Sequence, residues 1–304
     1  MKDEINKSEK VANLQEFVEQ DFKAETKIKI VIDSFKQNKA ALVSFFIVVF
    51  LIFIAIFGRY LMPYDPNIQD RNVIHQDASL SHLFGTDEHG RDIFSRILYG
   101  TRTSIFVGII AVCVSLFVGT VFGSIAGYYG GKIDSVIMRV MDVVLSIPSI
   151  LLAIALMASL GKGIDKAVLA ISIVAIPDYA MIVRGCLLSE KENDYVQAAK
   201  VVGASDSFII FKTILPNIAS SIVIRATLGV SSAILEAAAL GFLGLGVQPP
   251  IAEWGDMLGR SRMFMLSYPH EVFFPGAAIS LTVLAFNLLG DGLRDAFDPK
   301  SRRL

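Results

Sequence analysis

Long apolar runs separated by polar stretches dominate the hydropathy pattern of this 304-residue chain. A membrane-spanning helix needs about 20 mainly apolar residues, because unpaired backbone groups are costly in hydrocarbon. Six runs meet this requirement, and the predicted spans cover residues 40–58, 104–127, 136–160, 167–183, 219–246 and 272–290. The pattern therefore predicts an all-α, polytopic membrane protein with one transmembrane domain over residues 40–292.

Charged residues gather between these runs. Of the 57 charged residues, 42 lie in four stretches, at 1–39, 59–102, 184–212 and 291–304. The chain is 53% hydrophobic and only 19% charged, whereas soluble proteins average about 25% charged residues. This distribution argues against two soluble domains. The net charge of −1 gives no indication of nucleic acid as a partner.

The placement of Lys and Arg predicts the orientation. With the N-terminus inside, the inner stretches carry 14 Lys and Arg residues and the outer stretches carry 9. Because positive residues concentrate in cytoplasmic loops, both termini are predicted to be cytoplasmic. The resulting non-membrane segments are an N-terminal segment at 1–39, an outer loop at 59–102, an inner loop at 184–217 and a C-terminal tail at 293–304.

The first 39 residues alternate Lys and Glu too densely for the apolar core of a signal peptide. Apolar residues recur there at roughly helical spacing, at Val11, Leu14, Val18, Phe22, Ile28, Ile32 and Phe35. Such a stripe is typical of a helix lying on the inner membrane surface. A loosely ordered charged tail is the alternative.

The second predicted span carries a small residue at every fourth position: Ala111, Ser115, Gly119, Gly123 and Gly127. This spacing places the five on one helix face, where another helix can approach closely. The neighbour is expected either within this chain or in a partner subunit, and ordinary helix packing is the simplest interpretation.

Ionisable residues inside the spans are few, and such residues usually face a partner or an aqueous path. The available ones are Arg139, Asp142, Asp178, Arg225 and Glu236. Glu236 has no charged neighbour in sequence and lies roughly 25 Å along the fifth span at 1.5 Å per residue. Two interpretations stand: Glu236 lines a transport path, or it makes a buried structural hydrogen bond.

The inner loop carries the most informative local pattern, from Asp194 to Pro216. Asp194 is a suitable N-cap for a short helix with an apolar and alanine-rich face. Gly203 allows a sharp turn after that helix, and Pro216 suits the first turn of the next span. Small side chains on such a helix would let it press into a groove on another protein.

This loop resembles the cytoplasmic signature of permease subunits of ABC importers. The first part of that signature is occupied by Gln197, Ala198 and Ala199, and a glycine, Gly203, follows six positions after Gln197. The signature ends with Ile214-Leu215-Pro216. Two positions depart from the family pattern. Gln197 stands where Glu is usual and therefore lacks its charge, and Thr213 stands where many members have Ile.

Three longer strings resemble the oligopeptide/dipeptide permease family, and specifically its second, C-type permease subunit. They lie at residues 84–96, at 241–255 and at 287–299. Nickel importers use closely related subunits. The resemblance implies six spans in the type I importer fold, in the cell membrane, and alternating access as the mechanism.

The resemblance also implies partners. They are a homologous second permease, two cytoplasmic ATPase subunits that bind ATP and Mg, an extracytoplasmic binding protein, a peptide substrate and membrane lipid. The residues expected to contact the ATPase are Asp194, Gln197, Ala198, Ala199, Lys200, Gly203, Ala204, Ile214, Leu215 and Pro216, with Arg184 flanking them.

Motifs for chemistry within this chain are not found. The string Gly161-Lys-Gly163 lacks the spacing of a phosphate-binding loop, so no cofactor is predicted here and ATP hydrolysis is assigned to another chain. No nucleophile elbow or paired catalytic carboxylates occur, so the chain is not predicted to be an enzyme. His75, His82 and His89 suggest a solvated loop or docking surface rather than a metal site, and Cys113 and Cys186 indicate neither a disulfide nor a metal site.

Two rival functions belong to other classes. A secondary transporter would show an inverted repeat with broken helices in corresponding positions, and no such repeat is seen. A membrane-embedded enzyme would need a cluster of ionisable residues within the spans. The sequence favours an importer permease over both, with peptide as substrate and nickel or another small solute as the alternative.

Overall fold

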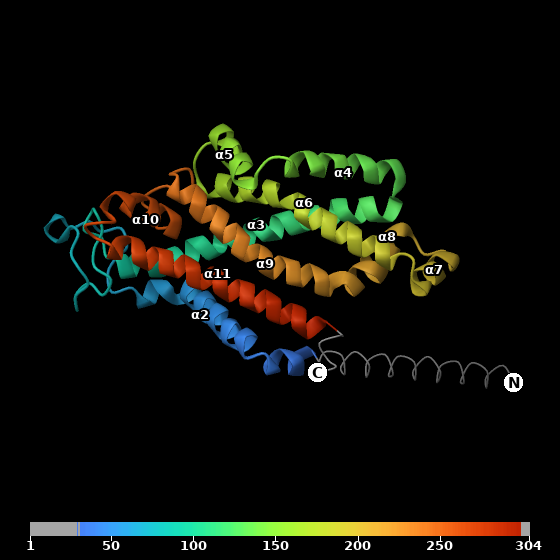
Figure 1. Ribbon diagram of the computed structural model, residues 1–304, viewed down its shortest axis with the longest axis horizontal. Helices are drawn as coiled ribbons and strands as arrows, with labels where there is room; N and C mark the ends of the chain where they lie inside the picture. Colours follow the sequence, from blue (N-terminus) through green and yellow to red (C-terminus); the bar gives the residue numbers. More distant parts are fainter. Residues whose placement is uncertain (1–28, 30, 299–304) are drawn as a thin grey trace.

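The computed structural model describes residue 29 and residues 31–298 (Figure 1). Residues 31–37 are helical, which includes the end of the predicted N-terminal stripe. The rest of that stripe, from Val11 to Ile28, and the last part of the C-terminal tail lie outside the described residues.

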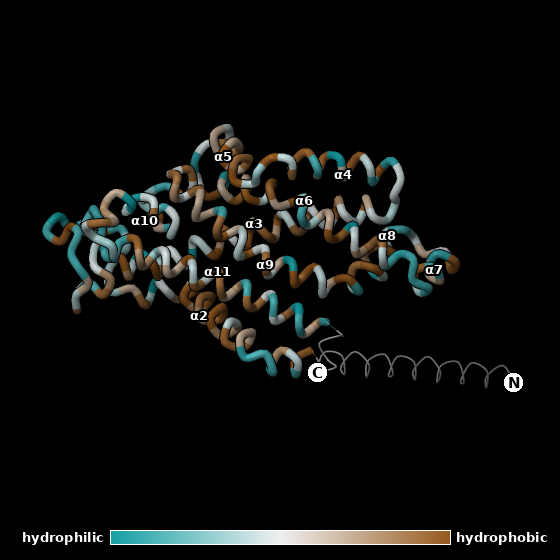
Figure 2. The backbone as a smooth tube through the Cα atoms, viewed as in Figure 1, coloured by the Kyte–Doolittle hydropathy of each residue, from teal (hydrophilic) through white to brown (hydrophobic). Residues whose placement is uncertain are grey.

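Five helices in the described part of the chain are long and apolar enough to cross a membrane. They are α2 (Lys39–Leu61), α3 (Ile93–Tyr129), α6 (Ile164–Glu190), α9 (Leu215–Phe242) and α11 (His270–Phe297). Figure 2 shows their apolar middles and their more polar ends. Each matches one predicted span, and most extend beyond it because polar turns continue the helix outside the apolar run.

The predicted third span, 136–160, is not one helix. It is broken into α4 (Gly131–Leu145) and α5 (Ser149–Leu160), which meet at 88° and count as a sixth span only as a bent pair. Pro148 explains the break, because proline lacks an N–H donor and disfavours helical geometry at the preceding residue, Ile147. The prediction of one continuous helix over residues 136–160 is therefore wrong, although the apolar run is long enough to span.

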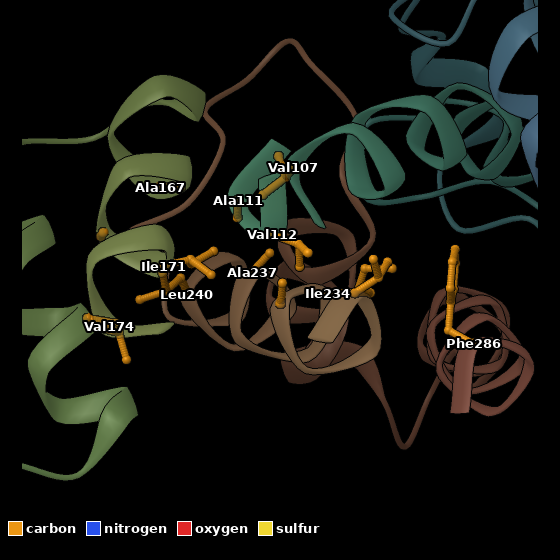
Figure 3. Close-up of a cluster of buried hydrophobic side chains, with 14 of the residues drawn as sticks. Val107, Ala111, Val112, Ala167, Ile171, Val174, Ile234, Ala237, Leu240 and Phe286 are labelled. Carbon is orange, nitrogen blue, oxygen red and sulfur yellow. The ribbon is translucent and has the colours of Figure 1, made fainter. Parts of the chain in front are cut away.

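The centre of the fold is the contact between α3 and α6, joined by α9. Figure 3 shows apolar side chains from these three helices and α11 meeting in one cluster. The small-residue face of α3 lies against α6 within this chain: a Cβ atom at Gly119 would come within 2.6 Å of the Tyr179 Cβ atom, and one at Gly127 within 3.2 Å of the Leu187 Cβ atom. Glycine at these positions lets the two backbones approach closely.

The end of the molecule opposite α7 (Asp194–Val201) is closed by the short helix α10 (Trp254–Ser261) and by the segment between α2 and α3 (Figure 1). That segment contains the 3₁₀ turn η1 (Arg71–Val73). The Trp254 indole donates to the Ile97 carbonyl of α3 at 3.2 Å. The buried Glu253 carboxylate accepts the Gly255 and Asp256 backbone N–H groups at 2.8 and 2.9 Å and so caps α10. The indole bond ties α10 to the N-terminal part of α3.

Each of the three loop histidines contacts its own carboxylate. His75 Nδ1 lies 2.5 Å from Glu271, His82 Nδ1 lies 3.0 Å from Asp92, and His89 Nδ1 lies 3.3 Å from Glu88. In the described part of the chain, no group of three or more His, Cys, Asp or Glu side chains is placed to hold a metal ion. Two of these contacts hold the loop against helices, because Glu271 lies in the first turn of α11 and Asp92 caps α3.

We predict that α10 and its contacts lose stability as the pH rises. Burial raises the pKa of Glu253 from 4.5 to about 7. The folded state therefore binds this proton more tightly than the unfolded state, so the stability is fully present below pH 4.5 and is lost as the pH rises through about 7. The loss is on the order of 3 kcal/mol.

Hydrogen exchange of the α10 amides between pH 5 and 8, corrected for intrinsic rates, measures this effect. Glu253→Gln, which cannot ionise, should remove the pH dependence. Asp77→Asn, at a carboxylate whose side chain is 91% exposed, should leave it unchanged. An equal pH dependence in Glu253→Gln and wild type would contradict the assignment.

Candidate functional site

The inner loop forms the short helix α7 (Asp194–Val201) at one end of the molecule (Figure 1). Its N-cap residue is Asn193, whereas Asp194 lies in the first turn, so the prediction that Asp194 caps the helix is wrong by one position. The Asn193 side chain bonds to Glu190 instead of to the α7 backbone. Asp194 still favours the helix, because a carboxylate in the first turn interacts well with the helix dipole.

Gly203 ends α7 in a left-handed conformation, with φ of +87°. The Gly203 N–H donates to the Lys200 carbonyl and the Ala204 N–H donates to the Ala199 carbonyl, both at 3.0 Å. This pair of bonds is the Schellman motif, which favours glycine because left-handed geometry strains other residues. The glycine therefore determines the direction in which the chain leaves α7.

One side of α7 is anchored and the other is open. Val196 is fully buried in a cluster with Leu187 of α6 and Ile214, whereas Val201 and Val202 are 88% and 86% exposed. Of the other predicted contact residues, Ala199, Ala204 and Leu215 are half-buried, and those that lie exposed are Asp194, Gln197, Ala198, Lys200, Gly203 and Pro216. An exposed valine pair beside small side chains suits a protein contact.

Polar contacts hold the loop to the ends of α3 and α6. The Tyr128 hydroxyl donates to Asp206 at 2.7 Å, and the Lys200 ammonium lies 5.7 Å from the centre of the same tyrosine ring. The Gln197 amide donates to the Lys191 carbonyl at 2.9 Å. This hydrogen bond uses the N–H donor that an amide has and an ionised carboxylate lacks, so it fixes the Gln197 side chain against the end of α6.

Arg184, which was expected beside the loop surface, is engaged by a residue of another helix. It makes a two-pronged pair with Asp134 of α4, at 2.5 and 2.6 Å, and thereby joins α4 to α6.

After the turn at Gly203, the chain enters a helical rod that has no break. The turn α8 (Asp206–Phe208), the π-helical segment η2 (Ile209–Ile214) and α9 form one span candidate over Asp206–Phe242. Pro216 lies in the first turn of α9, where its missing N–H costs little. The loop is thus mechanically continuous with α9.

A cavity of about 280 Å³ lies between α3, α6, α9 and the break between α4 and α5. Its apolar wall includes Ala111, Val112, Ile171 and Val174, four of the side chains labelled in Figure 3. The α4–α5 break contributes residues 144, 145 and 147–149. Non-helical backbone at membrane depth is tolerated where it lines a water-filled space, which suits an aqueous cavity here.

Three ionisable side chains, Asp178, Arg225 and Glu236, line this cavity. Asp178 follows Pro177 in α6 and accepts from Arg225 Nη2 of α9 at 2.8 Å. Glu236 lies on the same face of α9 and is half-buried, and Ser149 lines the same cavity. The cavity therefore has two carboxylates and one guanidinium.

The sequence singled out Glu236 but not the Asp178–Arg225 pair. The two residues are 47 positions apart, so no local pattern connects them. The sequence did offer one clue to this pair. Each residue is an isolated charge within a predicted span, and two opposite charges in that position favour pairing with each other.

Comparisons with known proteins give one consistent result. A family model described as "Binding-protein-dependent transport system inner membrane component" matches residues 119–303. A second model, "N-terminal TM domain of oligopeptide transport permease C", matches residues 26–79.

Similar curated proteins carry peptide transport names. A dipeptide transport system permease protein of Alkalihalophilus pseudofirmus is 50% identical over 267 residues, covering 88% of each chain. A glutathione transport system permease protein of Pectobacterium atrosepticum is 48% identical over 88% of this chain and 89% of its own. A dipeptide transport system permease protein of Haemophilus influenzae is 44% identical over 88% of this chain and 93% of its own.

Among solved structures, an inward-facing conformation of the MetNI methionine ABC transporter aligns with a TM-score of 0.50. The match has 20% sequence identity and covers 64% of this chain and 94% of the other chain. At this identity the match shows a shared fold.

Proposed function

The chain belongs to the family of inner membrane components of binding-protein-dependent transport systems, and from this membership we propose that it imports short peptides as the C-type permease of an ABC importer. It is a multi-pass membrane transport component whose family relies on a separate ATPase subunit. The observation that carries the peptide assignment is 44–50% identity, over 88% of this chain, to permeases named for dipeptides and glutathione.

The proposed assembly contains a homologous second permease, two cytoplasmic ATPase subunits that bind ATP and Mg, and an extracytoplasmic binding protein. Both termini lie in the cytoplasm in this proposal, as the distribution of Lys and Arg indicates. α7 and the exposed residues around Gly203 then face the ATPase, while α10 and the loop between α2 and α3 face the binding protein.

The proposed coupling element is α7 with the turn after it. ATP binding draws the ATPases together, and α7, anchored by Val196, passes this motion to the continuous helix that follows. α9 carries Arg225 and Glu236, so motion of this helix reshapes the cavity. Hydrolysis returns the spans to their starting arrangement.

Reconstitution in vesicles of the two permeases with the two ATPase subunits, to which the binding protein is added, tests the proposal. Uptake of radiolabelled dipeptide is expected only with ATP on the ATPase side and binding protein on the other side. Omission of either component, or use of a non-hydrolysable ATP analogue, should reduce uptake to background. Uptake of ⁶³Ni²⁺ without peptide uptake would assign a different substrate, and ATP-independent peptide uptake driven by an ion gradient would indicate a secondary transporter.

A further inference from the structure

The cavity between α3, α6, α9 and the α4–α5 break holds charged groups that pairing within the chain leaves unused. The Arg225 side chain is 32% exposed, and its one hydrogen bond within the described part of the chain runs from Nη2 to Asp178, so Nη1 has no partner there. A charged group beside a cavity with an unused donor favours an occupant that accepts from that donor.

The cavity also has one more carboxylate than it has positively charged side chains. The Asp178–Arg225 pair is neutral as a unit, and no Lys or Arg among the described residues forms an ion pair with Glu236. Ser149, which lines the same cavity, carries a hydroxyl but no positive charge. A half-buried carboxylate beside an aqueous space is complemented by a cation from outside the chain.

The two unused groups lie on one face of α9. The positions of this helix that line the cavity are Arg225, Gly229, Ser232, Ala233 and Glu236. Eleven residues separate its two ends, which corresponds to about 16 Å along a helix. An extended tetrapeptide measures about 13–14 Å, and side-chain reach covers the difference.

We infer that this cavity is a binding site for the ends of a short peptide in transit: Glu236 receives the α-ammonium group, and Arg225 Nη1 donates to the C-terminal carboxylate. The inference rests on the proposed function and adds the chemistry that the substrate must present. The apolar wall formed by Ala111, Val112 and Ile171 accepts side chains without selecting among them. A peptide of about four residues engages both ends together, and a dipeptide engages one end at a time.

The test measures equilibrium binding of radiolabelled tetra-alanine to the purified permease–ATPase complex in nanodiscs, without the binding protein. Removing the binding protein is essential, because it can select peptide termini independently. A charge-assisted hydrogen bond is worth about 1.5–3 kcal/mol, or roughly 10- to 100-fold in affinity. N-acetyl-tetra-alanine and tetra-alanine amide are each expected to bind at least about tenfold more weakly than the free peptide.

Two variants assign the ends. Glu236→Gln should bind the free and the N-acetylated peptides equally. Arg225→Lys keeps a positive charge for Asp178 but removes the separate Nη1 donor, and should weaken binding of the free peptide without changing its preference for a free amine. Asp165→Asn is the control, because this carboxylate is 68% exposed and lies outside the cavity.

The outcomes separate the inference from the proposed function. Receptor-driven uptake by the wild-type preparation with no binding of tetra-alanine, or with equal binding of all three peptides, overturns the inference and leaves the importer assignment intact. Absence of peptide uptake in the complete system argues against the importer assignment itself. The peptide series requires only the wild-type complex, so a variant that fails to assemble does not prevent the test.

Discussion

Replacing Gly123 by leucine is expected to prevent stable assembly of the membrane domain. A Cβ atom at this position would overlap the Ala180 carbonyl oxygen and lie 3.0 Å from the Val183 Cβ atom. Neither atom belongs to the far end of a flexible side chain, so α3 and α6 must separate along their shared face. Overpacking of a close helix contact costs about 1–3 kcal/mol and sometimes more, and separation also weakens the contacts of Gly119 and Gly127.

Thermal unfolding of the purified complex and its yield on size exclusion measure this loss. Gly185→Leu is the matched control, because Gly185 lies in α6 and a Cβ atom there has no neighbour within 4 Å. We expect the control to assemble normally. Normal stability of Gly123→Leu would show that α3 and α6 do not pack in this way in the membrane.

Replacing Gly203 by valine is expected to uncouple ATP hydrolysis from transport while the complex still assembles. A Cβ atom there meets no neighbour within 4 Å, so the substitution acts through the backbone angle of +87° and not through a clash. A left-handed conformation costs a residue with a side chain about 1–2 kcal/mol. This strain would favour a different exit from α7 and should lower binding-protein-stimulated ATPase activity by about five- to thirtyfold.

Asparagine at the same position separates strain from contact, because Asn tolerates the left-handed region better than other non-glycine residues. We expect Gly203→Asn to keep most of the stimulated ATPase activity. If both variants lose it equally, the site needs the small size of glycine against a partner rather than its backbone freedom. Full activity in Gly203→Val would show that the turn has no coupling role.

The spans were predictable because a membrane helix can be identified from the length and apolar composition of its sequence. The comparisons confirm the all-helical permease fold, and the described helices match five predicted spans. The break at Pro148 was missed because the apolar run continues on both sides of the proline, so hydropathy alone gave no boundary. The residue pair Ile147-Pro148 carried the necessary signal in its backbone chemistry.

The candidate site was predictable only in part, for a different reason. The residues of the inner loop are adjacent in sequence, so their pattern could be read directly, with an error of one position at the N-cap. The cavity is built from four separate helical segments, and the Asp178–Arg225 pair closes a separation of 47 residues. Contacts of this kind depend on how helices cross, which local sequence does not encode. The same holds for the loop histidines, whose even spacing of seven bears no relation to their three separate carboxylates.

The unbroken helix from Asp206 to Phe242 has a mechanical consequence. Its 37 residues form a rod about 55 Å long, and Arg225, where the ion pair attaches it to α6, lies close to the midpoint. Apolar clusters also hold the rod on both sides of this point, with Ile214 and Ile218 buried toward one end and Ile234 toward the other. In the proposed coupling, a push at the α7 end must therefore shift the whole packed helix rather than bend a free arm, so it strains the ion pair and both clusters together.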